Sequence, residues 1–353
     1  MNFKKKYTII LCLLCFTSLM FSCKKDVVEN PIPNQFSDGL LVLNEGLFHQ
    51  NNSTLDWIDL KTEEVSSNIF ESINQRLLGD TGNDLLLYGG KIYIAATTSS
   101  TVEILNRNDL KSIKQISFNY NNQAQEPRYF AKHKNKVFVT SFDGYVSAID
   151  TTTLNVTKRI KVGRNPDGIC ISGNSIFVAN SGGLDFGNMD STVMQIDLNT
   201  LEVVDTFVVG ENPGRMIADD YGNAYVVKQG DYINNPSELV KINTQTKEIV
   251  NLQIPATSIA KDGDKLYISH YDFNTGNSIV SIYNSASQSL ENPNFINSNS
   301  IETLYGIFPF EGGIICLDAM NYTNSGYLRF FDSNGTLKKS IHVGLNPTAI
   351  LKL

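Results

Sequence analysis

The sequence predicts an all-β fold, a seven-bladed β-propeller closed by its C-terminal strand. The first observation is a phrase, Val-Gly-x-Asn-Pro, that occurs at residues 162–166, 209–213 and 343–347. The second is an apolar run that ends in Asp or Asn before a short turn; it occurs seven times, ending at Asp59, Asn106, Asp150, Asp197, Asn243, Asn284 and Asp332. Repetition at intervals of about 45 residues is typical of an array of four-stranded units.

The patterning within each unit indicates strands and not helices. A second set of apolar runs also numbers seven, at residues 40–43, 92–95, 137–140, 176–179, 224–227, 266–269 and 314–317. Beyond the N-terminal segment, no run of about ten or more residues has the 3.6-residue spacing of a helix. The runs are almost wholly apolar, as expected if each blade is covered by a neighbour on both faces. Asp or Asn at the end of a run stabilises the turn, because its side chain accepts a hydrogen bond from the backbone N–H two residues on.

The two ends of the array predict how the ring closes. Gly39 begins directly at a second-strand motif, so the first unit lacks an inner strand. The last unit ends with a surplus strand at residues 346–351. If this strand pairs inside the first blade, the ring closes without an open seam between blades. We therefore predict one propeller domain at residues 38–353.

The N-terminus predicts export. Lys4–Lys6 precede an apolar run at residues 7–21, which is short for a membrane span. A basic start, a short apolar stretch and a small residue before the cut are typical of a secretory signal peptide, here residues 1–22. The alternative is an anchor helix that is retained.

The residues after this signal resemble those of a bacterial lipoprotein. Met20-Phe21-Ser22-Cys23 resembles a lipoprotein cleavage box, which implies that Cys23 is acylated and becomes the new N-terminus. The polar, proline-containing residues 23–37 then form a tether. Lys24-Lys25-Asp26 resembles the surface-export tag of Bacteroidota lipoproteins, so we expect lipid anchorage at the outer membrane, on the cell surface or on the periplasmic side.

Composition and charge restrict the class of partner. Of the 353 residues, 41% are hydrophobic and 18% are charged, which suits a globular core. The net charge of −7 becomes more negative once the signal and its three lysines are removed, so nucleic acid is a poor partner. Cys12 and Cys15 leave with the signal. Cys170 and Cys316 lie on strands of distant units, so we expect both to be small core residues without a disulfide.

Several stretches carry a family resemblance. The repeat resembles the YVTN-type propeller repeat at residues 137–140, 146–150 and 160–166. The opening resembles that of exported, DUF5074-like propellers of Bacteroidota, a group that includes cobalamin-capturing surface lipoproteins (BtuG type), at residues 43–48 (Leu-Asn-Glu-Gly-Leu-Phe), 52–55 and 78–80. The resemblance implies a protein without catalytic activity or cofactor that binds cobalamin or a related corrinoid and delivers it to a TonB-dependent transporter.

Strand parity places the long loops on one rim of the ring. In a four-stranded meander, the second–third loops and the blade-to-blade connections share one rim, which we call the loop rim. The second–third loops are long in five units, at residues 44–54, 180–191, 228–237, 270–278 and 318–326. The other rim, the turn rim, has short turns such as Tyr88-Gly89-Gly90 and Ser172-Gly173-Asn174. Long loops on a rigid scaffold commonly carry binding sites.

The residues predicted to bind ligand lie on the loop rim and are aromatic, amide, thioether or guanidinium side chains. They are Phe48, Asn52, Arg76, Arg128, Tyr129, Phe142, Phe186, Met189, Arg215, Tyr232, Tyr271, Phe273, Tyr305 and Tyr322. Exposed aromatic rings among amides and arginines suit a large, partly apolar, hydrogen-bonding ligand. The alternative for each aromatic is that it packs on its own loop.

Signals for catalysis or metal binding are weak. The sequence has no Gly-x-Ser-x-Gly, His-Glu-x-x-His, Cys-x-x-Cys or phosphate-loop motif. His49 and His270 could share the loop rim as a metal or base site, and Asp185 with Asp190 could hold calcium, but solvated loop residues explain both pairs. Three hypotheses follow: a nutrient-binding surface lipoprotein, a protein- or glycan-binding scaffold for adhesion or envelope assembly, and a lactonase-like propeller enzyme with clustered acids and a metal in its channel.

Overall fold

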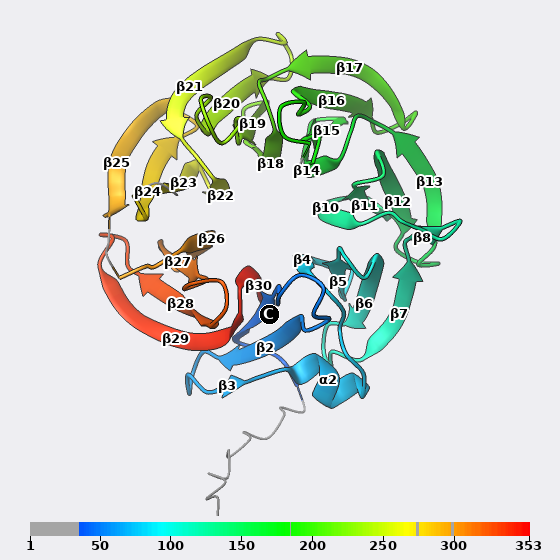
Figure 1. Ribbon diagram of the computed structural model, residues 1–353, viewed down its shortest axis with the longest axis vertical. Helices are drawn as coiled ribbons and strands as arrows, with labels where there is room; N and C mark the ends of the chain where they lie inside the picture. The colour runs from blue at the N-terminus through cyan, green and yellow to red at the C-terminus, as the bar shows by residue number, and fades with distance from the viewer. Residues whose placement is uncertain (1–34, 184, 273–274, 298–299) are drawn as a thin grey trace, which may run out of the picture. The chain divides into compact units, whose positions relative to one another are not determined.

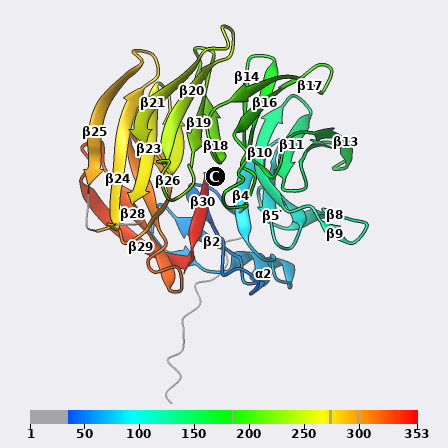
Figure 2. The same cartoon turned by 45° about the horizontal axis from the view of Figure 1, so that its top comes forward.

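The computed structural model describes residues 35–183, 185–272, 275–297 and 300–353, and these form a seven-bladed β-propeller (Figure 1, Figure 2). Each blade is a four-stranded antiparallel sheet. The predicted signal peptide, Cys23 and most of the predicted tether lie outside the described residues. Within the described residues, no helix has the length and apolar character to cross a membrane.

The blades are numbered along the chain, and their strands are given from the channel outward. They are blade 1, β30 (Pro347–Lys352), β1 (Gly39–Asn44), β2 (Thr54–Asp59) and β3 (Val65–Ser66); blade 2, β4 (Gly82–Tyr88), β5 (Lys91–Ala96), β6 (Thr101–Asn106) and β7 (Ser112–Ser117); blade 3, β10 (Pro127–His133), β11 (Lys136–Ser141), β12 (Tyr145–Asp150) and β13 (Val156–Lys161); blade 4, β14 (Pro166–Ser172), β15 (Ser175–Asn180), β16 (Thr192–Asp197) and β17 (Glu202–Val208); blade 5, β18 (Pro213–Ala218), β19 (Asn223–Lys228), β20 (Glu238–Asn243) and β21 (Ile249–Pro255); blade 6, β22 (Ser258–Asp262), β23 (Lys265–Asp272), β24 (Asn277–Asn284) and β25 (Ser289–Asn297); and blade 7, β26 (Leu304–Phe310), β27 (Gly313–Asp318), β28 (Ser325–Phe331) and β29 (Leu337–Leu345).

Two connections between blades contain regular structure. Helix α2 (Ile69–Asn74) lies between blades 1 and 2, and a small hairpin of β8 (Asn119–Tyr120) and β9 (Gln123–Ala124) lies between blades 2 and 3. The spacing of apolar residues in the sequence predicted neither of these elements. Helix α2 buries Ile69 and Phe70 in the core between blades 1 and 2, beside the two-residue outer strand β3.

The core consists of seven hydrophobic clusters, one between each pair of neighbouring blades. Alternate residues of one strand serve two clusters: Leu41 and Leu43 of β1 pack against blade 2, whereas Leu40 and Val42 pack against blade 7. Since both faces of each sheet are buried, the middle strands are apolar without interruption, as the sequence indicated. Cys170 and Cys316 are buried and free, as expected.

The C-terminal strand closes the ring as predicted. Strand β30 pairs antiparallel with β1, with Leu41 opposite Leu351 and Val42 opposite Ile350. The backbone N–H of Leu353 donates to Gly39 O at 3.0 Å, so the last residue lies beside the first residue of β1. In Figure 1 the red C-terminal strand lies against the blue first strands.

The seven repeated Asp and Asn residues hold the predicted turns. Asp150 Oδ1 accepts hydrogen bonds from the backbone N–H groups of Thr152 (3.0 Å) and Thr153 (2.8 Å). Equivalent bonds form at Asp59, Asn106, Asp197, Asn243, Asn284 and Asp332. These backbone hydrogen bonds lower the pKa of Asp150 and Asp197.

We expect Ile350→Ala to test how much closure stabilises the ring. Ile350 is buried between blades 7 and 1, so its truncation leaves a cavity at the seam and should lower the free energy of unfolding by about 2–4 kcal/mol. Denaturant unfolding measures this loss. Lys352→Ala, at an exposed position of the same strand, is the control and should change little. Equal stability of Ile350→Ala and wild type would show that the seam contributes nothing.

Candidate functional site

The innermost strand of each blade except blade 6 has an irregular register where it leaves the loop rim. In blade 3, Pro127 pairs with Ser141 and Phe130 pairs with Val139, so Arg128 and Tyr129 together stand opposite one residue. Equivalent shifts occur in β4, β14, β18, β26 and β30. A β-bulge of this kind bends the strand and re-aims its side chains.

Proline helps to place these bulges. Strands β10, β14, β18 and β30 each begin with a proline, which cannot donate to the strand ladder. The one or two residues that follow are the extra residues of the bulge. Their side chains include Arg128, Tyr129, Asp167, Arg215 and Thr348.

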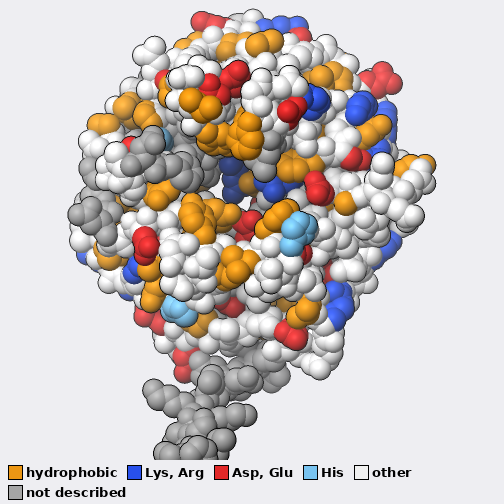
Figure 3. Space-filling view, viewed as in Figure 1, with side chains coloured by type: hydrophobic (Ala, Val, Ile, Leu, Met, Phe, Trp, Pro, Cys, Tyr) orange, Lys and Arg blue, Asp and Glu red, His pale blue; other side chains and the backbone are white. Residues whose placement is uncertain are grey.

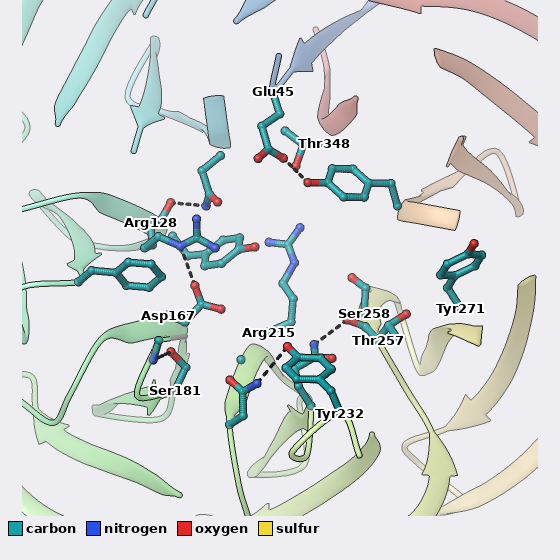
Figure 4. Close-up of a pocket in the computed structure, with 18 of the residues that line it drawn as sticks. Glu45, Arg128, Asp167, Ser181, Arg215, Tyr232, Thr257, Ser258, Tyr271 and Thr348 are labelled. Atoms are coloured by element: carbon teal, nitrogen blue, oxygen red, sulfur yellow. Dashed lines mark hydrogen bonds and ion pairs between the residues drawn. The ribbon is translucent and has the colours of Figure 1, made fainter. Parts of the chain in front are cut away.

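These side chains line a cavity of about 450 Å³ at the loop-rim end of the central channel. All seven blades contribute to it, with Glu45, Asn83, Arg128, Asp167, Arg215, Ser258, Tyr305 and Thr348 among the lining residues (Figure 4). Second–third loops add Ser181, Tyr232 and Tyr322. In Figure 3 basic side chains lie in the central hollow and hydrophobic side chains surround its mouth.

One side of the cavity is held by a salt bridge. Arg128 Nε donates to Asp167 Oδ1 at 2.8 Å, and both side chains are largely buried. The guanidinium also lies over the ring of Phe142, 4.7 Å from its centroid. Burial alone would lower the pKa of Arg128, but the charge and hydrogen bond of Asp167, together with Tyr129 and Glu45, outweigh burial and the pKa is raised. Arg128 is therefore a fixed positive charge.

The middle of the cavity contains a second guanidinium. Arg215 lies over the ring of Tyr129, 4.5 Å from its centroid, and its Nη1 is 4.0 Å from Asp84 Oδ1. Burial raises the pKa of Asp84 to about 6, although Arg215 and the backbone N–H of Phe130 oppose that shift. The Asp84 carboxylate is therefore a weak counter-ion, and it loses its charge just below neutral pH.

A carboxylate faces this pair from blade 1. The hydroxyl of Tyr305 donates to Glu45 Oε2, and Tyr305 also packs edge-on against Tyr322, with ring centroids 5.9 Å apart. Burial raises the pKa of Glu45, and the Tyr305 hydrogen bond partly offsets this. The Glu45 backbone N–H donates to Asn346 O at 2.8 Å, which fixes the residue to the closing strand.

Tyrosine rings form the remaining wall. Tyr232 is about half exposed; its hydroxyl accepts a hydrogen bond from Asn212 Nδ2 at 3.0 Å, and its ring lies 6.3 Å from that of Phe186. Tyr271 and Tyr322 also line the cavity. Tyrosine combines a flat apolar ring with a hydroxyl, so this wall can contact both apolar and hydrogen-bonding parts of one ligand.

Eight of the predicted ligand-binding residues come together in this cavity. They are Arg128, Tyr129, Phe142, Arg215, Tyr232, Tyr271, Tyr305 and Tyr322. Phe48 and Phe186 are exposed on loops, Asn52 accepts a hydrogen bond from the Leu47 N–H, and Met189 is half-buried.

The last two predicted residues are Arg76 and Phe273. Arg76 pairs with Glu103 at 2.8 Å and with Ser112, which belong to the outer strands β6 and β7 of blade 2, and it does not line the cavity. Phe273 lies outside the described residues.

Several polar residues of the lining were not predicted from the sequence. Glu45, Asn83, Asp84, Asp167, Ser258 and Thr348 lie at or next to the cavity. A signal was present, because Arg128, Asp167 and Thr348 each directly follow the proline that opens an inner strand. Alignment of the repeats at that proline would have predicted a ring of side chains.

The histidines and loop acids have local roles. His49 packs against Phe48, with ring centroids 3.8 Å apart, and His270 is half-buried, so burial lowers its pKa. Asp185 pairs with Arg164 at 3.1 Å, and Asp190 Oδ1 accepts a hydrogen bond from the Thr192 N–H. Among the residues that the structure describes, no group of three or more His, Cys, Asp or Glu side chains is arranged to hold a metal ion.

Comparison with known proteins gives a family and a fold. Residues 38–345 match the family model described as "Domain of unknown function (DUF5074)". No curated protein matches the chain.

Similar solved structures share the propeller architecture. A "putative 6-phosphogluconolactonase" from Bacteroides fragilis NCTC 9343 is 13% identical with a TM-score of 0.64, over 91% of this chain and 99% of that one. A protein of the same description from Bacteroides uniformis ATCC 8492 is also 13% identical, with a TM-score of 0.63 over 89% and 99% of the two chains. The Pan2 WD40 domain of Neurospora crassa is 11% identical, with a TM-score of 0.54 over 77% and 81%. At these identities the likeness shows the fold alone.

The Arg128–Asp167 salt bridge should contribute to stability. A double-mutant cycle with Arg128→Ala and Asp167→Ala is expected to give a coupling energy of about 1–3 kcal/mol, because both groups are largely buried. The exposed pair Lys61–Asp38, with side chains 75% and 69% exposed, is the control and should give less than about 1 kcal/mol. Equal coupling in the two pairs would contradict the assigned role of burial.

Asp84 should make stability depend on pH in a defined direction. Its pKa is raised from 3.8 to about 6 in the folded protein, so the folded state holds the proton more tightly than the unfolded state. The contribution of Asp84 to stability is therefore full below pH 3.8 and is lost as the pH rises to about 6. Denaturant unfolding across this range should show that Asp84→Asn lacks this loss. Parallel pH profiles for variant and wild type would refute the shift.

Proposed function

We propose that this chain, which belongs to the DUF5074 family, is a binding protein that captures a partly apolar, hydrogen-bonding ligand at the loop-rim end of its channel. The observation that carries the proposal is the cavity itself, in which two guanidinium groups and five tyrosines converge. Ligand sites commonly combine apolar walls with a few fixed polar groups in this way.

The rigidity of the lining supports a role in binding. The positions of Arg128, Asp167 and Arg215 are set by bulges in paired strands, and the salt bridge and cation–π contacts restrict their side chains further. A surface that is ordered before the ligand arrives loses little conformational entropy on binding.

A corrinoid is the ligand that we propose to test first, on the sequence resemblance to cobalamin-capturing lipoproteins. A corrinoid would lie across the mouth of the cavity. Phe48, Phe186, Tyr232 and Ile233, each more than half exposed, offer apolar surface on the loops that surround the mouth. Arginine and amide side chains in the cavity could then meet amide or phosphate groups of the ligand.

In the complete proposal, the protein is a surface lipoprotein. Acylation of Cys23 would anchor it to the outer membrane, and the ligand would pass to a TonB-dependent transporter. Support for the anchor comes from the sequence: the basic and apolar N-terminus, the cleavage box and the Lys-Lys-Asp segment after it. The transporter step is proposed only on the resemblance to cobalamin-capturing lipoproteins.

Two other functions lead to different experimental results. A scaffold for adhesion or envelope assembly would retain a protein or glycan partner in pull-downs without any small molecule. A lactonase-like enzyme would hold a stoichiometric divalent ion and turn over a sugar lactone. The lactonase alternative needs carboxylates to hold this ion, and two carboxylates of the described cavity already have partners: Asp167 is paired with Arg128, and Glu45 accepts a hydrogen bond from Tyr305.

Calorimetric titration of residues 24–353 with cyanocobalamin tests the ligand. We expect saturable binding at micromolar concentrations or below. Tyr232→Ala should weaken it about tenfold, because an aromatic anchor at the centre of a site is commonly worth more than 1 kcal/mol.

The matched control for this titration is Tyr221→Ala. Tyr221 is 52% exposed and Tyr232 is 53% exposed, but Tyr221 lies in the β18–β19 turn on the turn rim. This variant should bind like wild type. Absence of binding would remove the corrinoid, and equal losses in both variants would remove the loop rim as its site.

A further inference from the structure

Arg215 differs from the other cavity arginine in having unused hydrogen-bonding capacity. Arg128 directs its Nε to Asp167 at 2.8 Å, whereas the described residues form no hydrogen bond with the Arg215 guanidinium. Its only ion-pair partner among them, Asp84, is 4.0 Å away. A guanidinium has five N–H donors in a planar fork, and it costs free energy to keep them unpaired when they are removed from bulk water.

The position of Arg215 suits contact with a ligand. The side chain is 32% exposed and reaches into the middle of the cavity, with Arg128 on one side and Ser258 and Tyr271 across open space on the other (Figure 4). The ring of Tyr129 supports one face of the guanidinium at 4.5 Å. This cation–π contact restricts the guanidinium on one side, and its N–H donors remain available to a ligand in the cavity.

The charges around Arg215 restrict the ligand group that it can take. Two arginines, Arg128 and Arg215, share the cavity with three carboxyl groups, Glu45, Asp84 and Asp167. A doubly charged anion would be repelled by these carboxylates, whereas a singly charged oxyanion can accept the Arg215 hydrogen bonds at a smaller electrostatic cost.

We infer that Arg215 is the contact for a singly charged oxyanion of the ligand, a carboxylate or a phosphodiester, with the rest of the ligand against the tyrosine wall. This inference rests on the proposed binding function and specifies the chemistry of that same site. The guanidinium fork donates two parallel hydrogen bonds to the oxyanion, and Asp84 remains beside it as a competing counter-ion.

The counter-ion gives binding a pH dependence. The pKa of Asp84 is raised to about 6 by burial, against the opposing effects of Arg215 and Arg128. Below that pH the carboxyl is neutral and no longer competes with the ligand. Tyr129 is uncharged in this range because burial raises its pKa, and Asp167 is paired with Arg128. Burial also raises the pKa of Glu45, so protonation of Glu45 likewise favours anion binding at lower pH. Affinity for the oxyanion should therefore be greater at pH 5 than at pH 7.5, and binding near pH 6 should take up protons.

The experiment uses matched charged and neutral probes with residues 24–353. Calorimetric titrations compare D-glucuronate with D-glucuronamide for the carboxylate, and dimethyl phosphate with trimethyl phosphate for the phosphodiester. At least one anion should bind about tenfold or more tightly than its neutral partner, as expected for charge-assisted hydrogen bonds. The pair that shows this preference identifies the source of the oxyanion.

Substitutions then locate the contact. Arg215→Gln should abolish the preference for the anion, and Arg215→Lys should restore part of it. The control Arg107→Gln removes one positive charge in the β6–β7 turn of the turn rim and should leave the preference unchanged. Asp84→Asn should strengthen anion binding at pH 7.5 and reduce its pH dependence, leaving only the part due to Glu45, which tests the inference even if Arg215→Gln folds poorly.

The outcomes separate this inference from the proposed function. If anion and neutral probe bind equally and Tyr232→Ala weakens both, the cavity binds ligands but Arg215 does not select an oxyanion. If an anion preference survives in Arg215→Gln, the contact is elsewhere. If neither these probes nor cyanocobalamin binds, both the inference and the proposed function are overturned.

Discussion

The backbone pairing of β30 with β1 is the contact on which the rest of the structure depends. Each interior cluster lies between two neighbouring blades, so an unclosed chain would leave the outer faces of blades 1 and 7 without partners. The same seam also builds part of the site. The backbone N–H groups of Glu45 and Gly46 donate to Asn346 and Leu345, which places the Glu45 carboxyl at the cavity. The contacts that close the ring at blade 1 therefore also position part of the cavity lining.

The bulges of the inner strands are a second constraint, because they direct side chains into the cavity. Regular pairing would alternate the side chains of an inner strand between its two neighbouring blades and supply few groups to the channel. The bulges at the loop rim break this alternation, so that consecutive residues such as Arg128 and Tyr129 both line the cavity. The regularly paired middle strands supply much of the apolar clusters. The inner strands contribute to both, because residues such as Ile350 lie in a cluster while the bulged ends line the cavity.

The architecture could be predicted from the sequence because each blade repeats the same short sequence patterns. The caps such as Asp150, the apolar runs and the surplus C-terminal strand are each short-range patterns, and together they predicted the blade number and the closure. Eight of the twenty residues that line the cavity were among those predicted, since aromatic and arginine residues stand out in loops. The acids of the cavity were not, because Asp84 and Asp167 look like ordinary polar residues at a strand end. Their positions in the cavity depend on bulges, and their partners lie in other blades: Arg128 for Asp167 and Arg215 for Asp84. Local sequence spacing reports neither. Arg76 was included for its residue type, but helix α2 and the buried Glu103 direct it to the outer strands of blade 2.

The proximity of Gly39 and Leu353 has a consequence for engineering. Because these residues exchange backbone hydrogen bonds, a short peptide could join the two ends of the folded part without stretching either strand. New termini could then be opened at a short turn such as Ser172–Ser175, on the rim away from the cavity. A circularly permuted ring of this kind would keep every wall of the cavity in place while moving the chain termini from blade 1 to blade 4, on the same rim.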